Sequence, residues 1–162
     1  MKPKILMLLV AAMMTCAAVV PAQAESKTEA VVKPFYTKIL TRSSGADVAE
    51  TAMEVLDSDW RSIGAYGTPA KTREKFVAQI QKFGEIIPDL AWNIEEMITD
   101  GNRVIVRGRA KGTPRVPMFG VDGQGRSFDI MSIDIHKVEN GKIIESYHVE
   151  DWAHAMKQLK GK

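Results

Sequence analysis

The sequence is poor in cysteine. Its one cysteine, Cys16, lies within the first 24 residues, so a chain cleaved after Ala24 keeps none. This excludes disulfides and zinc–thiolate sites from residues 25–162, and the domain must rest on its apolar core. That length is enough for one domain that buries roughly two-thirds of its surface.

Net charge is also missing once the first 24 residues are set aside. All 20 acidic residues follow Ala24, whereas two of the 22 Lys and Arg precede it, which leaves 20 of each. No basic stripe with interleaved aromatic residues appears, so we expect no nucleic-acid partner. No His/Asp/Glu cluster has convincing metal-ligand spacing and no glycine-rich phosphate loop follows a strand, so we expect no metal and no cofactor.

A membrane span is not expected either. The uncharged apolar run over residues 5–20 is too short, and too closely followed by small residues, to be a stable span. Two lysines precede it, and an A-x-A pattern ending at Ala24 follows it. This predicts a signal peptide over residues 1–24, cleavage before Glu25, and a secreted or periplasmic protein without a membrane anchor. Cys16 raises the alternative of a lipoprotein, but the preceding Met-Met-Thr is a poor lipobox.

Helical periodicity dominates the first half of the remaining chain. Three segments have the apolar spacing of a helix: residues 31–40, 43–56 and 72–84. Pro34 is tolerable only near the first turn of the first helix. Ser44 or Asp47 would begin the second helix and Thr72 the third. The small-residue segment 57–71 is expected to be a loop.

Strand patterns dominate the second half. Four segments alternate or are rich in β-forming residues: residues 90–98, 103–110, 127–138 and 142–150. Asp100-Gly101 and Asn140-Gly141 are turn signals, and residues 112–125 form a long loop. A short helix follows from Trp152. Three helices, an antiparallel meander and a short closing helix predict a single α+β domain.

The long strand pattern over residues 127–138 carries polar groups on one face. Asp134 and His136 share this face with Phe128 and Ile130. An unpaired carboxylate in such surroundings is costly, so Asp134 either faces solvent, is held by a tyrosine or a backbone donor, or lines a pocket. His136 is either pocket-lining or exposed at the strand edge.

The partner of Asp134 on the next strand depends on the turn. A two-residue turn at Asn140-Gly141 would place Asp134 opposite Tyr147, with Asp151 on the same side. A three-residue turn with a bulge would move His148 and Glu150 to the side of Asp134 instead. The sequence leaves both registers open.

The order of elements and the stretches PDLAWNIEEMITDGNRVIVRGRAKGT and MFGVDGQGRSFDIMSIDIHKVENGKIIESYHVEDW resemble the NTF2-like superfamily. They are most similar to its SnoaL-like polyketide cyclase and ester cyclase branch. The resemblance implies a cone in which N-terminal helices pack on a strongly curved antiparallel sheet.

The resemblance also implies site residues. In the SnoaL-like branch an aspartate after the last strand is the acid/base of a cyclisation, and Asp151 is the matching position, although it also fits the N-cap of the closing helix. The branch often has tryptophan where this chain has Tyr147. Asp134 matches the strand aspartate of ketosteroid isomerase, a worked example of a protonated oxyanion-hole acid. The catalytic tyrosine of that enzyme falls nearest Phe35, with Tyr36 one residue away.

The general base of ketosteroid isomerase has no acidic counterpart here, because Ile63 or Gly64 falls at about its position. Steroid isomerisation by that mechanism is therefore not expected.

Two functions fit these residues. The first is a cofactor-independent cyclase or isomerase that acts on a small, hydrophobic, carbonyl-containing molecule, with Asp151, Asp134 and His148 as catalytic groups. Tyr36, Trp60, His136 and Tyr147 would then bind the substrate, Trp60 as a lid or as a plug under the helices. The alternative is a non-catalytic periplasmic binding module for a small hydrophobic ligand.

The opposite face of the same strand predicts an assembly. Met131, Ile133 and Ile135 make that face apolar too, and a sheet that is apolar on both faces usually covers the second with a partner. We expect a homodimer through this face.

Export gives the first testable prediction. Mass spectrometry of the periplasmic or secreted fraction should find a mature N-terminus at Glu25 or within a few residues of it. Recovery of a chain that begins at Met1, or of one with an acylated Cys16, would contradict the signal peptide.

Overall fold

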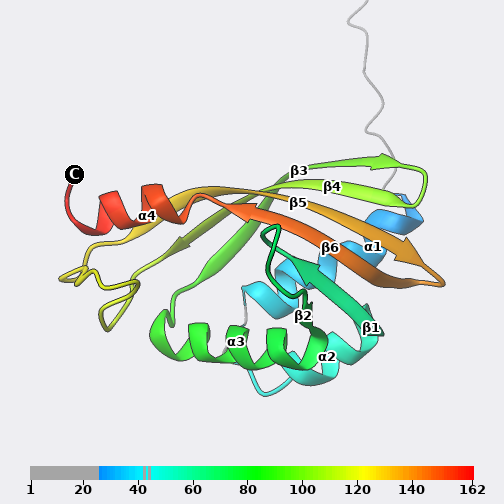
Figure 1. The fold of residues 1–162 in the computed structure, drawn as a ribbon, viewed down its shortest axis with the longest axis horizontal. Coiled ribbons are helices and arrows are strands. Elements are labelled where there is room, and N and C mark those ends of the chain that lie inside the picture. The colour runs from blue at the N-terminus through cyan, green and yellow to red at the C-terminus, as the bar shows by residue number, and fades with distance from the viewer. Residues whose placement is uncertain (1–25, 42, 44) are drawn as a thin grey trace, which may run out of the picture.

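The computed structural model describes residues 26–41, 43 and 45–162 (Figure 1). The predicted signal peptide and the candidate cap Ser44 lie outside the described residues. The elements are α1 (Lys27–Pro34), the π-helix η1 (Phe35–Leu40), α2 (Val48–Val55), β1 (Leu56–Ile63), β2 (Lys71–Thr72), α3 (Arg73–Ile86), β3 (Ala91–Asp100), β4 (Arg103–Gly112), β5 (Phe128–Glu139), β6 (Lys142–Glu150) and α4 (Trp152–Leu159).

One six-stranded sheet, in the order β2-β1-β6-β5-β4-β3, organises the domain. Neighbouring strands are antiparallel except β1, which pairs parallel with β6. The sheet is therefore mixed, and the predicted α+β class is confirmed. In Figure 1, α1, α2 and α3 lie on one side of the sheet, and α4 continues from the end of β6. We call the sheet face toward these helices the inner face.

The first helix begins earlier than predicted. It starts at Lys27, where Ser26 and Glu29 form a capping box, and Pro34 is its last residue. Since proline has no backbone N–H, it breaks the α-helical hydrogen bonding at this point. The chain continues as η1, and the N–H of Thr41 donates to the carbonyl oxygen of Tyr36 at 3.0 Å, a five-residue step.

Strand β1 replaces part of the predicted loop over residues 57–71. Within it only Leu56, Trp60 and Ser62 are buried, and the other positions are polar or partly exposed. Because so few of its side chains are apolar, the strand lacked a hydrophobic signal. Helix α2 consequently ends at Val55, and Asp47 occupies its N-cap position without a side-chain hydrogen bond.

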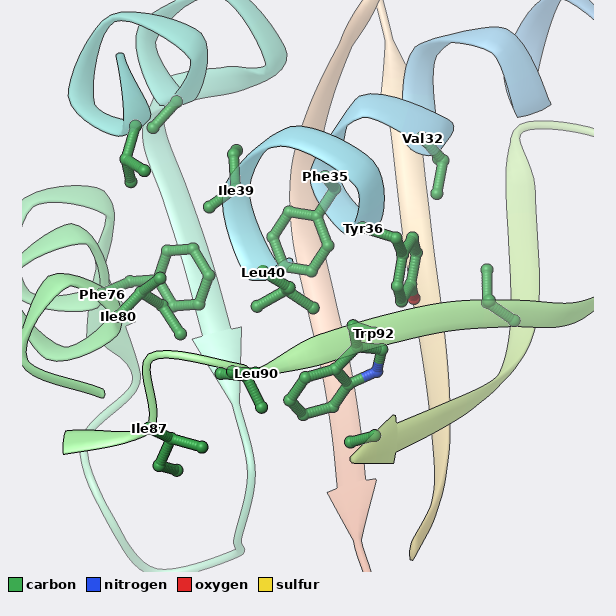
Figure 2. Packing of buried hydrophobic residues seen from close by; sticks show 14 of the residues in the cluster. Val32, Phe35, Tyr36, Ile39, Leu40, Phe76, Ile80, Ile87, Leu90 and Trp92 are labelled. Carbon is green, nitrogen blue, oxygen red and sulfur yellow. The ribbon is translucent and has the colours of Figure 1, made fainter. Parts of the chain in front are cut away.

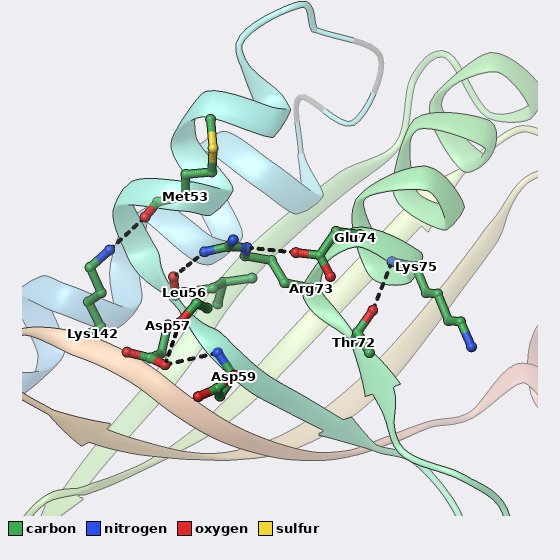
Figure 3. Close-up of polar contacts among 10 residues, drawn as sticks. Met53, Leu56, Asp57, Asp59, Thr72, Arg73, Glu74, Lys75 and Lys142 are labelled. Atoms are coloured by element: carbon green, nitrogen blue, oxygen red, sulfur yellow. Dashed lines mark hydrogen bonds and ion pairs between the residues drawn. The ribbon is translucent and has the colours of Figure 1, made fainter.

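Helix α3 begins as predicted, because the Thr72 hydroxyl oxygen accepts from the N–H of Lys75 at 3.4 Å. It runs past Gly84 to Ile86, two residues further than expected. Figure 3 shows how this region is tied together. Arg73 donates to the Leu56 carbonyl oxygen at 3.3 Å, and the Lys142 ammonium donates to the Met53 carbonyl oxygen at 2.7 Å. These bonds link α3 to β1 and α2 to β6.

The core fills the space between the helices and the inner face. Phe35 of η1 stacks on Phe76 of α3, with ring centroids 5.4 Å apart, and Trp92 of β3 closes the core from the sheet (Figure 2). Along β4 and β5 the even-numbered residues are buried, among them Val104, Val106 and Gly108. None of the described helices is long and apolar enough to cross a membrane.

Candidate functional site

A cavity of about 270 Å³ lies between η1, α3 and the inner face of the sheet. This size suits a small organic ligand. Its apolar wall includes Phe35, Leu40, Phe76, Ile80, Phe83 and Trp92. Its polar wall comes mainly from β1, β2, β5 and β6, with Ser62, Lys71, Asp134, Ser146, His148 and Glu150.

The register of β5 and β6 follows the first predicted alternative at the turn and neither alternative beyond it. Asn140 and Gly141 both have positive φ and form a two-residue turn, so Glu139 pairs with Lys142. The register then shifts by one at Ile144, since Val138 pairs with Ile143 but Lys137 with Glu145. This bulge turns the rest of β6 over.

As a result His148, not Tyr147, lies opposite Asp134, and Glu150 lies opposite Ser132. The inner face of β6 is therefore polar from Ser146 to Glu150. Tyr147 is on the outer face of the sheet, 36% exposed, and is not a cavity residue. The bulge reverses the side on which Tyr147 lies, so the structure does not bring it to the cavity with Asp134 and His148.

Asp134 is the buried acid of the cavity, with 4% of its surface exposed. Burial raises the pKa of its carboxyl to about 7, and the charge of Glu150 adds to the rise. Hydrogen bonding by Tyr36 and Ser132 and the charge of His148 act in the opposite direction. The carboxyl therefore exchanges its proton near neutral pH, where both forms are populated.

His148 and Glu150 form a pair beside it. The Nδ1 atom of His148 lies 2.9 Å from a carboxylate oxygen of Glu150, and both side chains are about one-fifth exposed. When Nδ1 donates to Glu150, Nε2 carries the lone pair. The ring packs against Gly64, where a Cβ would stand 2.8 Å from Cε1 and Nε2 of the histidine. Only glycine leaves room for this ring position.

A second polar group runs from the cavity wall, at Trp60 and Ser146, into the core behind it. The Tyr36 hydroxyl is 2.7 Å from His136 Nε2, and His136 Nδ1 is 2.8 Å from the Ser146 hydroxyl. The indole N–H of Trp60 donates to the same hydroxyl oxygen at 3.0 Å. Burial, reinforced by the charge of His148, lowers the pKa of His136 to about 3, so its ring is neutral.

One assignment of protons gives each donor in this group an acceptor. The indole of Trp60 can only donate, so Ser146 accepts from it and donates its own proton to His136 Nδ1. His136 then donates from Nε2 to the Tyr36 oxygen, which leaves the Tyr36 proton for Asp134. Burial, and next the charge and hydrogen bonding of Asp134, raise the pKa of Tyr36 well above its usual value. The chain of hydrogen bonds thus points toward Asp134.

A shorter chain reaches the same carboxylate from the other side. The indole N–H of Trp92 donates to the Ser132 hydroxyl at 3.1 Å, and Ser132 donates to Asp134 at 3.3 Å. Gly108 makes this possible, because a Cβ there would stand 2.5 Å from the Ser132 hydroxyl and 3.0 Å from the Trp92 indole nitrogen. Both chains therefore start at a tryptophan and end at Asp134.

The structure brings together only some of the predicted site residues. Asp134, His148 and Trp60 line the cavity, whereas Tyr36 and His136 are fully buried behind its wall and act on it through hydrogen bonds. Asp151 is exposed and is not part of the lining; its carboxylate accepts from the N–H of His154 at 2.9 Å and caps α4.

The cavity also holds residues that the predicted site omitted. Glu150 followed from one of the two possible registers and could have been included. Lys71 belongs to a two-residue strand, and no sequence pattern marked it. Within the described part of the chain, no group of three or more His, Cys, Asp or Glu side chains could hold a metal ion.

Comparison with known proteins agrees with this fold. A family model described as SnoaL-like polyketide cyclase matches residues 30–159. The chain therefore belongs to the SnoaL-like polyketide cyclase family, within the NTF2-like α+β fold. No curated protein matches it.

Solved structures share the fold at low sequence identity. A protein from Jannaschia sp. CCS1, assigned as a SnoaL-like polyketide cyclase, superposes with a TM-score of 0.72 at 20% identity over 87% of this chain and 96% of its own. IdmH from Streptomyces antibioticus, assigned as a polyketide cyclase, gives 0.70 at 21% identity over 83% and 99%. A protein with a ketosteroid isomerase-like fold from Catenulispora acidiphila, in complex with trimethylamine, gives 0.62 at 11% over 80% and 92%.

The pKa of Asp134 predicts how stability depends on pH. The folded chain holds this proton up to about pH 7, whereas the ordinary value is 3.8. Because the folded-state pKa is raised, the stabilisation that comes from the protonated carboxyl is complete below about pH 4. This stabilisation is lost as pH rises through about 7. Between pH 5 and pH 8, Asp134→Asn should therefore gain roughly 2–3 kcal/mol of unfolding free energy relative to wild type. Urea denaturation at several pH values measures this difference.

His136 affects the unfolding free energy in the opposite direction. Its pKa is lowered to about 3, so the stability that comes from its neutral form is lost as pH falls. Comparison of wild type with the variant cancels this background. Asp129→Asn is the matched control, because hydrogen bonding to Arg109 helps hold the pKa of Asp129 at about 2, so it is ionised throughout this range. The difference in unfolding free energy between wild type and Asp134→Asn should change with pH, whereas that between wild type and Asp129→Asn should not. If both differences stay constant, the buried, protonated carboxyl is contradicted.

Proposed function

We propose that the protein is exported and catalyses cofactor-independent enolisation, leading to cyclisation or isomerisation, of a small carbonyl compound. The observation that carries the proposal is the position of Asp134, a buried acid with its pKa near neutrality, opposite the His148–Glu150 pair in one apolar cavity. Membership in the SnoaL-like family supports the same reaction class.

The two halves of the reaction fall to different residues. Removal of a proton next to a carbonyl needs a base and a donor for the oxyanion that develops. His148 is the base, because it lines the cavity opposite Asp134 and Glu150 holds its Nδ1. Protonated Asp134 is the donor, as a carboxylic acid kept neutral by its surroundings can donate a hydrogen bond.

The hydrogen-bond chains serve the donor. When a ligand oxygen takes the proton of Asp134 in a hydrogen bond, negative charge grows on the carboxyl. Tyr36 and Ser132 both donate toward that carboxyl, so they stabilise this charge without moving. Gly64 leaves space for the His148 ring close to where ketosteroid isomerase carries its base.

Isotope exchange tests this assignment without knowledge of the natural substrate. The mature protein should accelerate the exchange of protons beside the carbonyl group of small aromatic ketones in D2O, followed by NMR. His148→Gln and Asp134→Asn should each lower the rate on the order of a hundredfold, because each removes one half of the acid–base pair. The wild-type rate should fall as pH rises through about 7, where Asp134 loses its proton.

Asp151→Asn is the matched control, since it keeps a capping oxygen outside the cavity and should retain the wild-type rate. A hundredfold loss in that variant would restore the acid–base role that the sequence predicted for Asp151. Ketones that bind wild type but exchange no faster than in buffer would leave the binding-module alternative.

We also propose that two copies associate through the outer face of the sheet. Met131 is 55% exposed, Ile133 40% and Val149 69%, so apolar side chains of two central strands face outward together. Exposed apolar patches of this kind mark interaction sites, and no described helix covers them (Figure 1).

Light scattering should give a dimer mass for the mature protein at micromolar concentration. Ile133→Lys should shift it to a monomer with an unchanged fold, whereas Val116→Lys, at an exposed residue of the long loop, should leave the dimer intact. A monomeric wild type would contradict the proposal.

A further inference from the structure

Three polar side chains line the cavity without a hydrogen bond or ion pair to another described residue. Ser62 of β1, Lys71 of β2 and Gln79 of α3 all line it. None of the three side chains makes a hydrogen bond or ion pair with another residue in the part of the chain that the structure describes. By contrast, Asp134, His148 and Glu150 are already engaged with protein neighbours.

The sheet fixes where this group lies relative to the acid–base pair. Lys71 pairs with Ser62, and Ser62 pairs with Ser146 of β6, two residues before His148. Since neighbouring strands lie about 4.8 Å apart, the backbone of Lys71 is roughly 10 Å from that of β6 across the sheet. A small molecule can therefore reach both places at once.

The hydroxyl of Ser62 is open to the cavity. Ser62 is 5% exposed, and no buried side-chain polar atom in the described part of the chain lacks a hydrogen bond, so this unpaired hydroxyl is reached from the cavity. A ligand that covers the hydroxyl has to supply a hydrogen bond, because a polar group buried without a partner is costly. The cavity therefore favours a ligand that accepts hydrogen bonds at this place.

The charge of the group selects the sign of that ligand. Lys71 is half-buried, and burial lowers the pKa of its ammonium while the charge of Glu150 only partly opposes the effect. The Glu150 carboxylate is held by His148 at 2.9 Å. An ammonium, a hydroxyl and an amide N–H can all donate, and a carboxylate accepts from several donors at once.

We propose that Lys71, Ser62 and Gln79 form a carboxylate subsite, so that the substrate is a small keto acid whose carbonyl group lies at Asp134 and His148. This inference rests on the proposed function for the carbonyl end only. It excludes neutral esters and amides as preferred ligands.

Matched probes test the subsite by binding alone. Titration calorimetry on the mature protein would compare 3-benzoylpropionate, an aromatic keto acid, with its neutral primary amide. Wild type should bind the acid at least tenfold more tightly than the amide. Lys71→Met keeps the length of the side chain without its charge, and should bind both within about twofold of each other. Unchanged amide binding shows that the variant is folded.

Lys75→Met is the control for loss of a lysine near this site. Lys75 lies in the first turn of α3, is exposed and does not line the cavity (Figure 3). It should keep the tenfold preference. The readout is binding and not turnover, so a failure of the enolisation proposal does not imitate a failure of the subsite.

Three results would overturn the subsite: no preference for the acid in wild type, including no binding of either probe; a preference that survives in Lys71→Met; or one that is lost equally in Lys75→Met. Borohydride treatment with the probe would reveal an imine at Lys71 by a mass increase. Such an adduct would make Lys71 a nucleophile for the carbonyl carbon, which also contradicts carboxylate binding.

Discussion

The burial of Asp134 is the constraint on which the inner face of this sheet depends. A carboxyl in mid-strand, 4% exposed, is tolerated only if it keeps its proton or is well supplied with donors. The structure provides both conditions. Two chains of hydrogen bonds lead toward it, from two tryptophans through two serines, a neutral histidine and a tyrosine. Gly108 leaves room for Ser132 and Trp92 in the shorter chain. Much of the polar content of the core is therefore explained by one acid.

The same constraint divides the cavity into parts with different properties. Beside Asp134 the polar groups bind each other, so their geometry is set before a ligand arrives. At Lys71 and Ser62 the polar groups face the cavity without protein partners. A ligand meets a preorganised centre at Asp134 and accessible donors at Lys71 and Ser62, and aromatic rings from η1 and α3 line the same cavity. Orientation of the ligand then follows from its own polarity.

The alternation of apolar and polar residues was enough to predict the α+β class, most elements, and the shared face of Asp134 and His136. It could not place His148, because the bulge at Ile144 depends on how β6 fits between β1 and β5. It missed β1, whose few buried side chains gave no periodic signal. Asp151 fitted both the acid/base position of the family and the N-cap of the closing helix, and the structure shows it as the N-cap. Local patterns thus predicted faces, and long-range pairing decided which residues meet.

The parallel pairing of β1 with β6 has a consequence for the order of folding. β1 ends at Ile63, whereas its neighbour begins at Lys142, so the two join only after nearly the whole chain is available. Closing so long a loop is entropically costly, and strands of this kind pair late. Until then β1 pairs only with the two-residue strand β2, and the cavity lacks the side chains that β6 contributes. During synthesis the binding site therefore becomes complete only when the last strand, β6, has been made.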